Sequence, residues 1–255
     1  MPTTSQRHVL CLGDSLTRGQ VSVDYVEMLA TRDNGGPVTF TNAGVNGDLA
    51  FNVLPRLDSV IGLRPDAVSV LIGTNDANAS LSEKNIRMMT RMKKLPTRPT
   101  IEWYREHLTA IVDRLTAETS ARIALLSLPV LGEELGSPSV QRSADYSAVV
   151  KEIADACNVT YLPLHERQVD SLTAGRHTPG IRFRNGRLLS AIAATQHFVL
   201  RRSFDSISRR HGLQLTTDLI HQNTRGATMI ADLIGDFLQE ADDTTPVCPA
   251  KPEGK

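Results

Sequence analysis

The chain has 255 residues, of which 40% are hydrophobic and 22% are charged, a composition typical of a globular domain with one sizeable core. Lysine plus arginine balances aspartate plus glutamate at 28 each, so no net charge attracts nucleic acid or a membrane surface, although local charged patches can still form, and we expect no nucleic-acid partner. The three cysteines, Cys11, Cys157 and Cys248, are too few and too far apart for a disulfide framework or a zinc site.

The N-terminal stretch MPTTSQRHVLCLGDS has no long apolar run and no cleavage-like pattern of small residues, so we expect no secretory signal. No segment approaches the roughly 18 apolar residues of an integral membrane helix. Few and scattered cysteines fit a reducing compartment. These observations together predict a cytoplasmic protein.

Short runs rich in apolar and β-branched residues predict five buried strands, at 8–12, 38–42, 67–72, 122–128 and 159–164. Helical spacing fills the segments between them. In residues 143–157, for example, Tyr146, Val149, Val150 and Ile153 share one stripe. This alternation predicts an α/β fold with a five-stranded, mostly parallel sheet covered on both faces. Ligands of such folds bind at the carboxyl ends of the strands.

Three polar clusters follow the first three strands in turn: GDS, NAGVNGD and GTND. The last helix is expected to begin after Asn223, which is placed to cap it. The polar, proline-containing composition of residues 241–255 predicts a mobile tail. We therefore expect a single domain over residues 1–240. Two long connections, near 78–99 and 165–213, are insertions that exceed what the alternation needs.

A candidate nucleophile lies in the stretch LCLGDSLTRG, where Ser15 follows the first strand. Asp and Ser at such a junction often only cap the next helix. Near the end, Asp218 and His221 are three residues apart, and a carboxylate at that spacing in a turn can reach the imidazole Nδ1, leaving Nε2 free as a base. The alternative is that Asp218 caps a turn and His221 is merely exposed. An ester hydrolase needs a nucleophile, a base, a group that orients the base, and oxyanion donors.

Four blocks occur in one order: GDSLT, NAGVNGD, GTND and DLIHQN. In these blocks the chain resembles the SGNH hydrolase family, also called GDSL esterases and lipases. The resemblance spans about residues 8–240. It implies a flavodoxin-like three-layer α/β/α sandwich and a serine ester hydrolase that acts on a small-molecule ester without metal or organic cofactor. It indicates neither the natural ester nor the oligomeric state.

Carried onto this sequence, the resemblance implies Ser15 as nucleophile, His221 as base and Asp218 as the residue that orients the imidazole. The backbone N–H groups of Ser15 and Gly47 and the side-chain amide of Asn75 would form the oxyanion hole, and their chemistry suits that task. Leu219 and Gln222 stand where family members commonly carry glycine and proline. We therefore expect a somewhat different backbone in this turn.

Other readings of the same residues stay open. An acyltransferase would use the same acyl-enzyme, and a binding module would use the fold without catalysis. A metal-dependent phosphoesterase would use Asp14, Asn75, Asp76 and His221, but the chain lacks a GNHD run and a clustered histidine pair. For Asp14 and Asp76 themselves we favour structural roles in loop hydrogen bonding.

The insertions suggest two further hypotheses. In the first, Leu81, Met88, Met89, Met92 and Leu95 form an apolar stripe, and Met88 and Met92 are candidates to line an acyl pocket, although such a stripe more often packs an insertion onto the body. The second insertion is rich in arginine and either recognises an anionic group or is a solvated face. Its arginines are Arg176, Arg182, Arg184, Arg187, Arg201, Arg202, Arg209 and Arg210.

Overall fold

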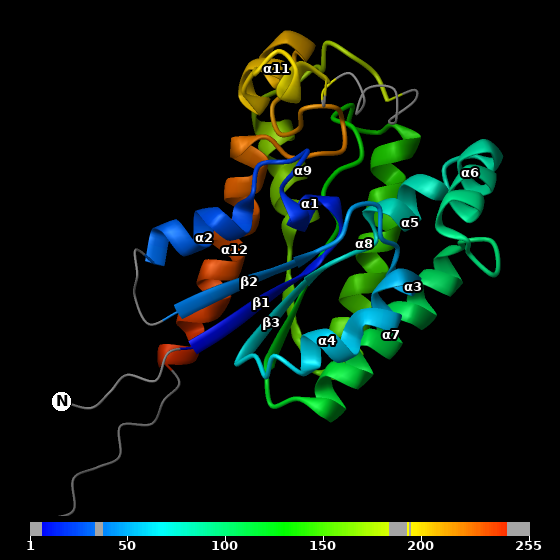
Figure 1. Cartoon of the computed structure of the whole chain (residues 1–255). Helices are drawn as coiled ribbons and strands as arrows, with labels where there is room; N and C mark the ends of the chain where they lie inside the picture. The colour runs from blue at the N-terminus through cyan, green and yellow to red at the C-terminus, as the bar shows by residue number, and fades with distance from the viewer. Residues whose placement is uncertain (1–6, 34–37, 184–192, 194, 244–255) are drawn as a thin grey trace, which may run out of the picture.

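A computed structural model describes residues 7–33, 38–183, 193 and 195–243 (Figure 1). Its centre is a five-stranded, all-parallel sheet with the strand order β2-β1-β3-β4-β5. This order and the helices on both faces confirm the predicted fold class. The strands are β1 (Arg7–Gly13), β2 (Val38–Gly44), β3 (Ala67–Leu71), β4 (Arg122–Leu126) and β5 (Thr160–Leu162).

The central strand β1 shows why the sheet is buried on both sides. Leu10 and Leu12 face one layer of helices, whereas Val9 and Cys11 face the other, as the period of two in a strand requires. Burial raises the pKa of the Cys11 thiol to about 12, so this side chain acts as a small apolar group. Strand β5 is shorter than the predicted 159–164 because Pro163 follows it and has no N–H for the ladder.

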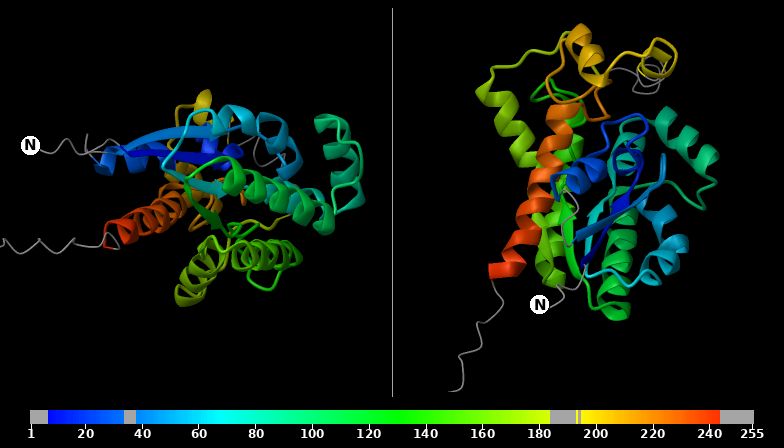
Figure 2. Two further views of the ribbon diagram at one scale, coloured as in Figure 1. Left: turned by 90° about the horizontal axis from the view of Figure 1, so that it is seen from below. Right: turned by 60° about the vertical axis from the view of Figure 1, so that its left-hand side comes forward.

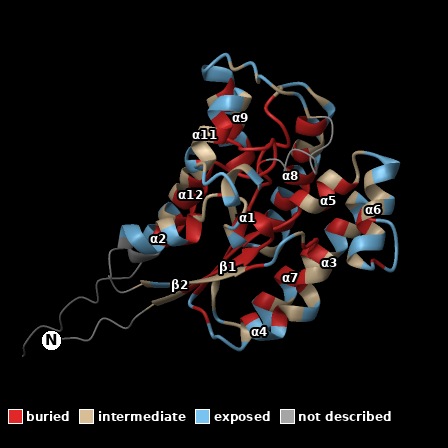
Figure 3. Ribbon diagram, turned by 45° about the horizontal axis from the view of Figure 1, so that its top comes forward, coloured by how far each residue is buried: buried red, intermediate tan, exposed pale blue. Residues whose placement is uncertain are grey.

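Helices cover both faces, which gives three layers (Figures 1 and 2). The face that includes Val9 packs against α2 (Tyr25–Asp33) and α12 (Thr224–Asp243). The other face packs against four helices, α3 (Ala50–Val53), α4 (Leu57–Ile61), α7 (Ile101–Glu118) and α8 (Pro138–Cys157). Colouring by burial shows the same division, with buried residues along β1 and exposed ones on the outer sides of α2 and α4 (Figure 3).

Helix α12 begins as predicted, because Asn223 Oδ1 accepts a hydrogen bond of 3.1 Å from the Gly226 N–H. The helix continues to Asp243, into the predicted tail, and residues 244–255 of that tail lie outside the described residues. Among the described helices, none is long and apolar enough to span a membrane.

Short helices lie at the carboxyl edge of the sheet. They are α1 (Ser15–Arg18), α5 (Thr74–Ala79), α6 (Glu83–Lys93) and α11 (Phe204–His211), whereas the 3-10 turn η1 (Leu54–Arg56) joins α3 to α4. The first insertion holds α6, which Ser82 caps at its start. The second holds α11 and most of α9 (Leu164–Ala174), while its residues 184–192 and 194, with Arg184 and Arg187, lie outside the described part. In Figure 1, α6 and α11 stand at the end toward which the strands point.

Candidate active site

The junction after β1 gives its two polar residues different tasks. Asp14 is the N-cap of α1, and its Oδ1 accepts a 2.9 Å hydrogen bond from the Leu16 N–H. Ser15 is the first residue of α1, and its Oγ lies 3.1 Å from His221 Nε2. The capping role expected of such a junction therefore falls to Asp14, while the Ser15 hydroxyl is directed to an imidazole.

The loop before α12 completes a row of three groups. His221 Nδ1 lies 2.8 Å from Asp218 Oδ2, and Nε2 faces Ser15. Asp218 Oδ1 accepts two backbone hydrogen bonds, 3.1 Å from the Ile220 N–H and 2.8 Å from the His221 N–H. The carboxylate thus fixes both the ring and the backbone of His221. The structure brings together all three residues that the sequence singled out for this row.

Asp218 also sets the charge preference of His221. Burial disfavours the imidazolium, but the charge of Asp218 and its hydrogen bond outweigh burial, with a smaller contribution from Asp14. Together they raise the pKa of His221 above its usual 6.5. A proton taken up at Nε2 is therefore stabilised at this position.

The turn between Asp218 and His221 differs from a glycine-bearing turn, as Leu219 and Gln222 led us to expect. Leu219 adopts a left-handed φ of +73°, a conformation that costs about 1–2 kcal/mol outside glycine. The Leu219 carbonyl accepts a 2.8 Å hydrogen bond from the Gly132 N–H. The buried Gln222 side chain accepts a 2.7 Å hydrogen bond from Gln168 Nε2 and donates at 3.1 Å to the Ile220 carbonyl. The turn nevertheless holds Asp218 and His221 in contact.

Two other loops carry the candidate oxyanion donors. Gly47 has a φ of +73°, and a Cβ there would lie 3.1 Å from Lys93 Cε, so both conformation and space favour glycine. Asn75 lies in the first turn of α5. Its Nδ2 donates to Asp14 Oδ2 at 3.1 Å and to the Asp48 carbonyl at 3.0 Å. An oxyanion bound by Asn75 would replace one of these acceptors.

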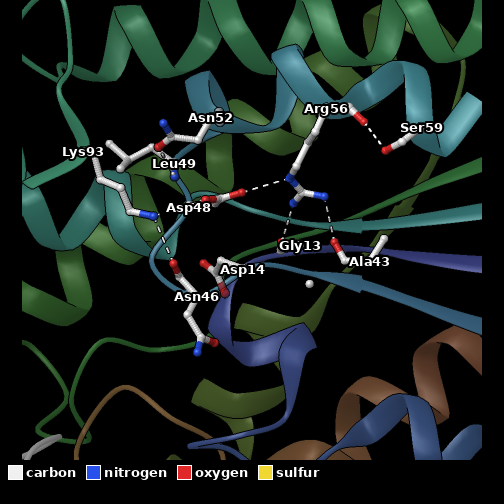
Figure 4. Close-up of polar contacts among 12 residues, drawn as sticks. Gly13, Asp14, Ala43, Asn46, Asp48, Leu49, Asn52, Arg56, Ser59 and Lys93 are labelled. Atoms are coloured by element: carbon white, nitrogen blue, oxygen red, sulfur yellow. Dashed lines mark hydrogen bonds and ion pairs between the residues drawn. The ribbon is translucent and has the colours of Figure 1, made fainter.

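Charged side chains tie the Gly47 loop to its surroundings (Figure 4). The Asp48 carboxylate accepts hydrogen bonds from Arg56 Nε at 3.0 Å and Lys93 Nζ at 3.2 Å. Arg56 also donates to the Ala43 and Gly13 carbonyls, each at 2.9 Å, at the ends of β2 and β1. Lys93 donates to the Asn46 carbonyl at 3.0 Å. None of these three charged residues was predicted from the sequence as part of the site.

Two buried acids stand beside the row. Burial raises the pKa of Asp14 to about 6 and that of Asp76 to about 7. Asp76 Oδ2 accepts a 3.2 Å hydrogen bond from the Ala50 N–H, while its Oδ1 has no hydrogen-bond partner in the described structure. Both carboxyls thus bond loop amides, as we favoured. Across residues 7–33, 38–183, 193 and 195–243, no three His, Cys, Asp or Glu side chains gather to hold a metal ion.

A pocket of about 270 Å³ opens on Ser15 and His221. Met88 and Met92 line it together with Gly47 and Asn75, so the pocket brings together every predicted site residue except Asp218, which lies behind His221. The remaining lining residues, which the sequence analysis missed, are Val21, Asn46, Asn78, Met89 and Ile220. Met89 was predicted as part of the stripe but not of the site. Met89 lies three residues before Met92, and this i, i+3 spacing in α6 is the signal that could have added it to the site.

A parallel α/β/α sandwich that aligns a hydroxyl, an imidazole and a carboxylate at its carboxyl edge has the groups that a serine hydrolase requires. The chain belongs to the GDSL-like Lipase/Acylhydrolase family, which it matches over residues 11–227. The resemblance predicted from the four sequence blocks is confirmed, and the protein is a carboxylic ester hydrolase.

Solved structures share this fold. Axe2, an acetylxylan esterase from Geobacillus stearothermophilus, has a TM-score of 0.64 at 19% identity, over 94% of this chain and 96% of its own. AlAXEase, an acetyl xylan esterase, has a TM-score of 0.66 at 16% identity, over 91% and 99%. LAE5, an alpha/beta hydrolase enzyme from the metagenome of Lake Arreo, Spain, has a TM-score of 0.62 at 19% identity, over 90% and 94%. No curated protein matches the chain by sequence.

Proposed function

We propose that the protein hydrolyses its ester through an acyl-enzyme on Ser15, with His221 as general base and Asp218 as the group that orients it. One observation carries the proposal: Ser15 Oγ lies 3.1 Å from His221 Nε2, within reach for proton transfer. Two solved catalytic mutants of Axe2 add support, because one replaces a serine by alanine and the other an aspartate by alanine.

In this mechanism His221 Nε2 takes the proton of Ser15 as Oγ attacks the acyl carbonyl. The backbone N–H groups of Ser15 and Gly47 and the Asn75 amide stabilise the oxyanion of the tetrahedral intermediate. When the intermediate collapses, the C–O bond breaks and His221 gives its proton to the departing alcohol. Water then attacks the acyl carbonyl as His221 takes its proton, and the second tetrahedral intermediate collapses when the bond to Ser15 Oγ breaks, His221 returns the proton to Oγ and the acid leaves. Asp218 stays ionised and stabilises the imidazolium throughout.

We propose a short acyl group for the substrate. The pocket of about 270 Å³ lies just below the roughly 300–1,000 Å³ that is typical of small-molecule sites, and three methionines of α6 line it. Two structures of the same fold are named as acetylxylan esterases, whose acyl group is acetyl. Methionine side chains adapt their shape, so we expect a preference for short chains rather than strict exclusion of longer ones.

The first experiment measures hydrolysis of p-nitrophenyl esters from acetate to decanoate by wild type, Ser15→Ala and the control Ser59→Ala, with and without a chelator. Ser59 is an exposed serine of α4, away from the pocket. We expect Ser15→Ala to lose at least about 1,000-fold in kcat, and Ser59→Ala and the chelator to change nothing. Full activity in Ser15→Ala would contradict the acyl-enzyme, and loss with chelator would favour the phosphoesterase alternative.

The same assay separates water from an alcohol as acyl acceptor. Products are analysed by mass after addition of a primary alcohol. Release of free acid alone supports the hydrolase, whereas a dominant new ester would identify the acyltransferase that uses the same acyl-enzyme.

A further inference from the structure

A fully buried glutamate lies beside the loop that carries Asp218 and His221. Glu133 follows β4 at the carboxyl edge of the sheet and has 0% of its surface exposed. Its Oε1 accepts from the Leu215 N–H at 2.9 Å, the Thr216 N–H at 2.8 Å and the Thr216 hydroxyl at 2.7 Å. Its Oε2 accepts from the Gln214 N–H at 2.7 Å.

Such a cluster is specific for an acidic side chain. Three consecutive backbone N–H groups and a hydroxyl all point at one group that has only acceptors. A buried carboxylate is tolerated where several hydrogen bonds replace the water that it loses. The His177 Nε2 lies at a salt-bridge distance of 2.8 Å from Oε2. Glu133 therefore supplies the acceptors for the N–H groups of residues 214–216, the segment that leads into Asp218.

Gly132, the residue before Glu133, binds the same loop at a second point. The Gly132 N–H donates to the Leu219 carbonyl at 2.8 Å. Gly132 itself has a φ of +84°, which favours glycine. Gly132 and Glu133 thus bind the loop before Asp218 and between Asp218 and His221.

The loop requires such support because its own backbone is strained at Leu219. Within the loop, the Thr217 N–H donates to the His221 carbonyl at 2.8 Å, and Thr216 bridges Gln222. These bonds close the turn on itself, and the Ser22 hydroxyl and the Val23 N–H bind Gln222 and tie the end of the turn to the segment after α1. The contacts of Gly132 and Glu133 connect the turn to the segment that follows β4. Strand β4 lies in the same sheet as β1, which leads to Ser15.

We infer that Glu133 is a positioning residue, which holds Asp218 and His221 at the distance from Ser15 that proton transfer needs. The inference rests on the proposed function of these three residues. Glu133 acts through the acid–base loop, whereas Gly47, Asn75 and Met88 line the pocket from the loop after β2 and from helices α5 and α6. Its loss therefore affects kcat far more than KM. A displacement of about 1 Å in a catalytic group lowers turnover by as much as 100-fold.

The test compares Glu133→Gln with the matched control Glu134→Gln. Glu134 is the neighbouring residue, and its half-exposed carboxylate lies 3.5 Å from Arg182 Nε at the surface. Active sites are counted by the endpoint of labelling with a fluorophosphonate, and kcat is expressed per labelled site. We expect Glu133→Gln to lose about 10- to 100-fold in kcat per site, with KM changed less than threefold, and Glu134→Gln to match wild type.

A purely structural role for Glu133 predicts a different result. Fewer molecules would then be labelled and the melting temperature would fall, but each labelled site would retain the kcat of wild type. That outcome would overturn the inference. So would a rise in KM at constant kcat.

The His221→Ala background adds an independent check. If Glu133 acts through His221, then Glu133→Gln should lower the residual activity of His221→Ala by less than about threefold, because residues that act as a unit are not additive. A second full loss of 10-fold or more in that background would show that Glu133 acts elsewhere, and would contradict the inference.

Thr216→Val is a second, milder variant that tests the same inference if Glu133→Gln does not fold. This change removes only the 2.7 Å hydroxyl bond to Oε1 and preserves side-chain shape. We expect a two- to fivefold loss in kcat per site, and an unchanged value would overturn the inference. Failure of the proposed function looks different: wild type would not be labelled, or Ser15→Ala would stay active.

Discussion

Asp218 uses its two oxygens for two purposes. One binds the imidazole ring of His221, and the other binds the backbone N–H groups of Ile220 and His221. The carboxylate therefore determines both which ring nitrogen carries the proton and where the ring lies. A neutral amide of the same shape can satisfy only part of this pattern, because its NH₂ group donates where the ring nitrogen also needs to donate.

Asp218→Asn tests this pairing. We expect kcat to fall by about 1,000- to 10,000-fold, because the amide favours the wrong imidazole tautomer. In wild type, His221 must be neutral to act as base, so kcat/KM should rise with pH through an apparent pKa above 6.5. Removal of the negative charge should move that limb to lower pH. A pH profile that is the same in both proteins would contradict the assigned role.

Asn75→Ala tests the candidate oxyanion hole. The loss of one such donor typically lowers kcat by about 100- to 1,000-fold, and we expect a loss in this range with KM nearly unchanged. The comparison variant is Asn158→Gly at the end of α8, which has a left-handed backbone far from the pocket and should keep wild-type kcat. Equal kcat in Asn75→Ala and wild type would remove Asn75 from the oxyanion hole.

The predicted site residues share a property that made them visible in the sequence. Ser15, Gly47 and Asn75 each follow a strand in a short block, and Asp218 and His221 lie three residues apart. The structure brings them together, and their roles stay predictions. Glu133 was not visible, because its partners are 81 to 83 residues away and backbone N–H groups leave no mark in a sequence. The Lys93 contact with Asp48 spans 45 residues and was missed for the same reason.

At the scale of elements, α6 forms one wall of the pocket. Met89 is buried against Leu49 and Ala79 and anchors the helix, whereas Met92 is 47% exposed and lies at the pocket. Packing and pocket lining are thus shared along one helix face. The period of apolar residues predicted that face, and Met88 and Met92 lie at the pocket as expected, whereas Met89 lines it without having been named for it.

Met88→Ala and Met92→Ala should each widen the pocket at this wall. We expect the ester series to show a shift toward longer acyl chains, by about two- to tenfold in relative kcat/KM, since one methylene in an apolar pocket changes selectivity by up to about 200-fold. The matched control is Met28→Ala in α2, which packs against the other face of the sheet. An unchanged chain-length profile in both α6 variants would contradict the acyl-pocket hypothesis.

At Leu219, the free-energy cost of a left-handed backbone opposes the stability gained by burying the side chain. In Leu219→Gly the relief of about 1–2 kcal/mol of left-handed strain is smaller than the roughly 2–5 kcal/mol lost with a fully buried leucine side chain. We expect the free energy of unfolding in urea to fall by about 1–3 kcal/mol. Arg64→Gly relieves a φ of +48° with an exposed side chain and should change stability by less than about 1 kcal/mol. A stabilised Leu219→Gly would show that strain dominates.

Across the whole molecule, two buried acids link folding to pH. Asp14 and Asp76 have raised pKa values in the folded state, so the folded chain binds more protons than the unfolded chain between about pH 4 and pH 7. Stability contributed by these two groups is therefore greatest at low pH and is lost as pH rises through this window. This is the reverse of a carboxylate that is held in an ion pair.

Asp76→Asn measures that linkage. From pH 5 to pH 8 the free energy of unfolding of wild type should fall, relative to the variant, by roughly 2–3 kcal/mol. Urea unfolding at several pH values gives the two curves, with Asp113→Asn on the exposed side of α7 as control. Parallel curves for wild type and Asp76→Asn would show that Asp76 ionises normally.

The hydrogen bond between Ser15 and His221 joins residues 206 positions apart in the chain. Its two ends lie at the start of α1 and just before α12, so nearly every strand and crossover helix is made between them. In a refolding chain, His221 reaches Ser15 only after the strands and helices between them have packed. The recovery of esterase activity therefore reports when the whole fold is complete. Contacts of such high order form slowly. Spectroscopic recovery of secondary structure should therefore precede the return of activity.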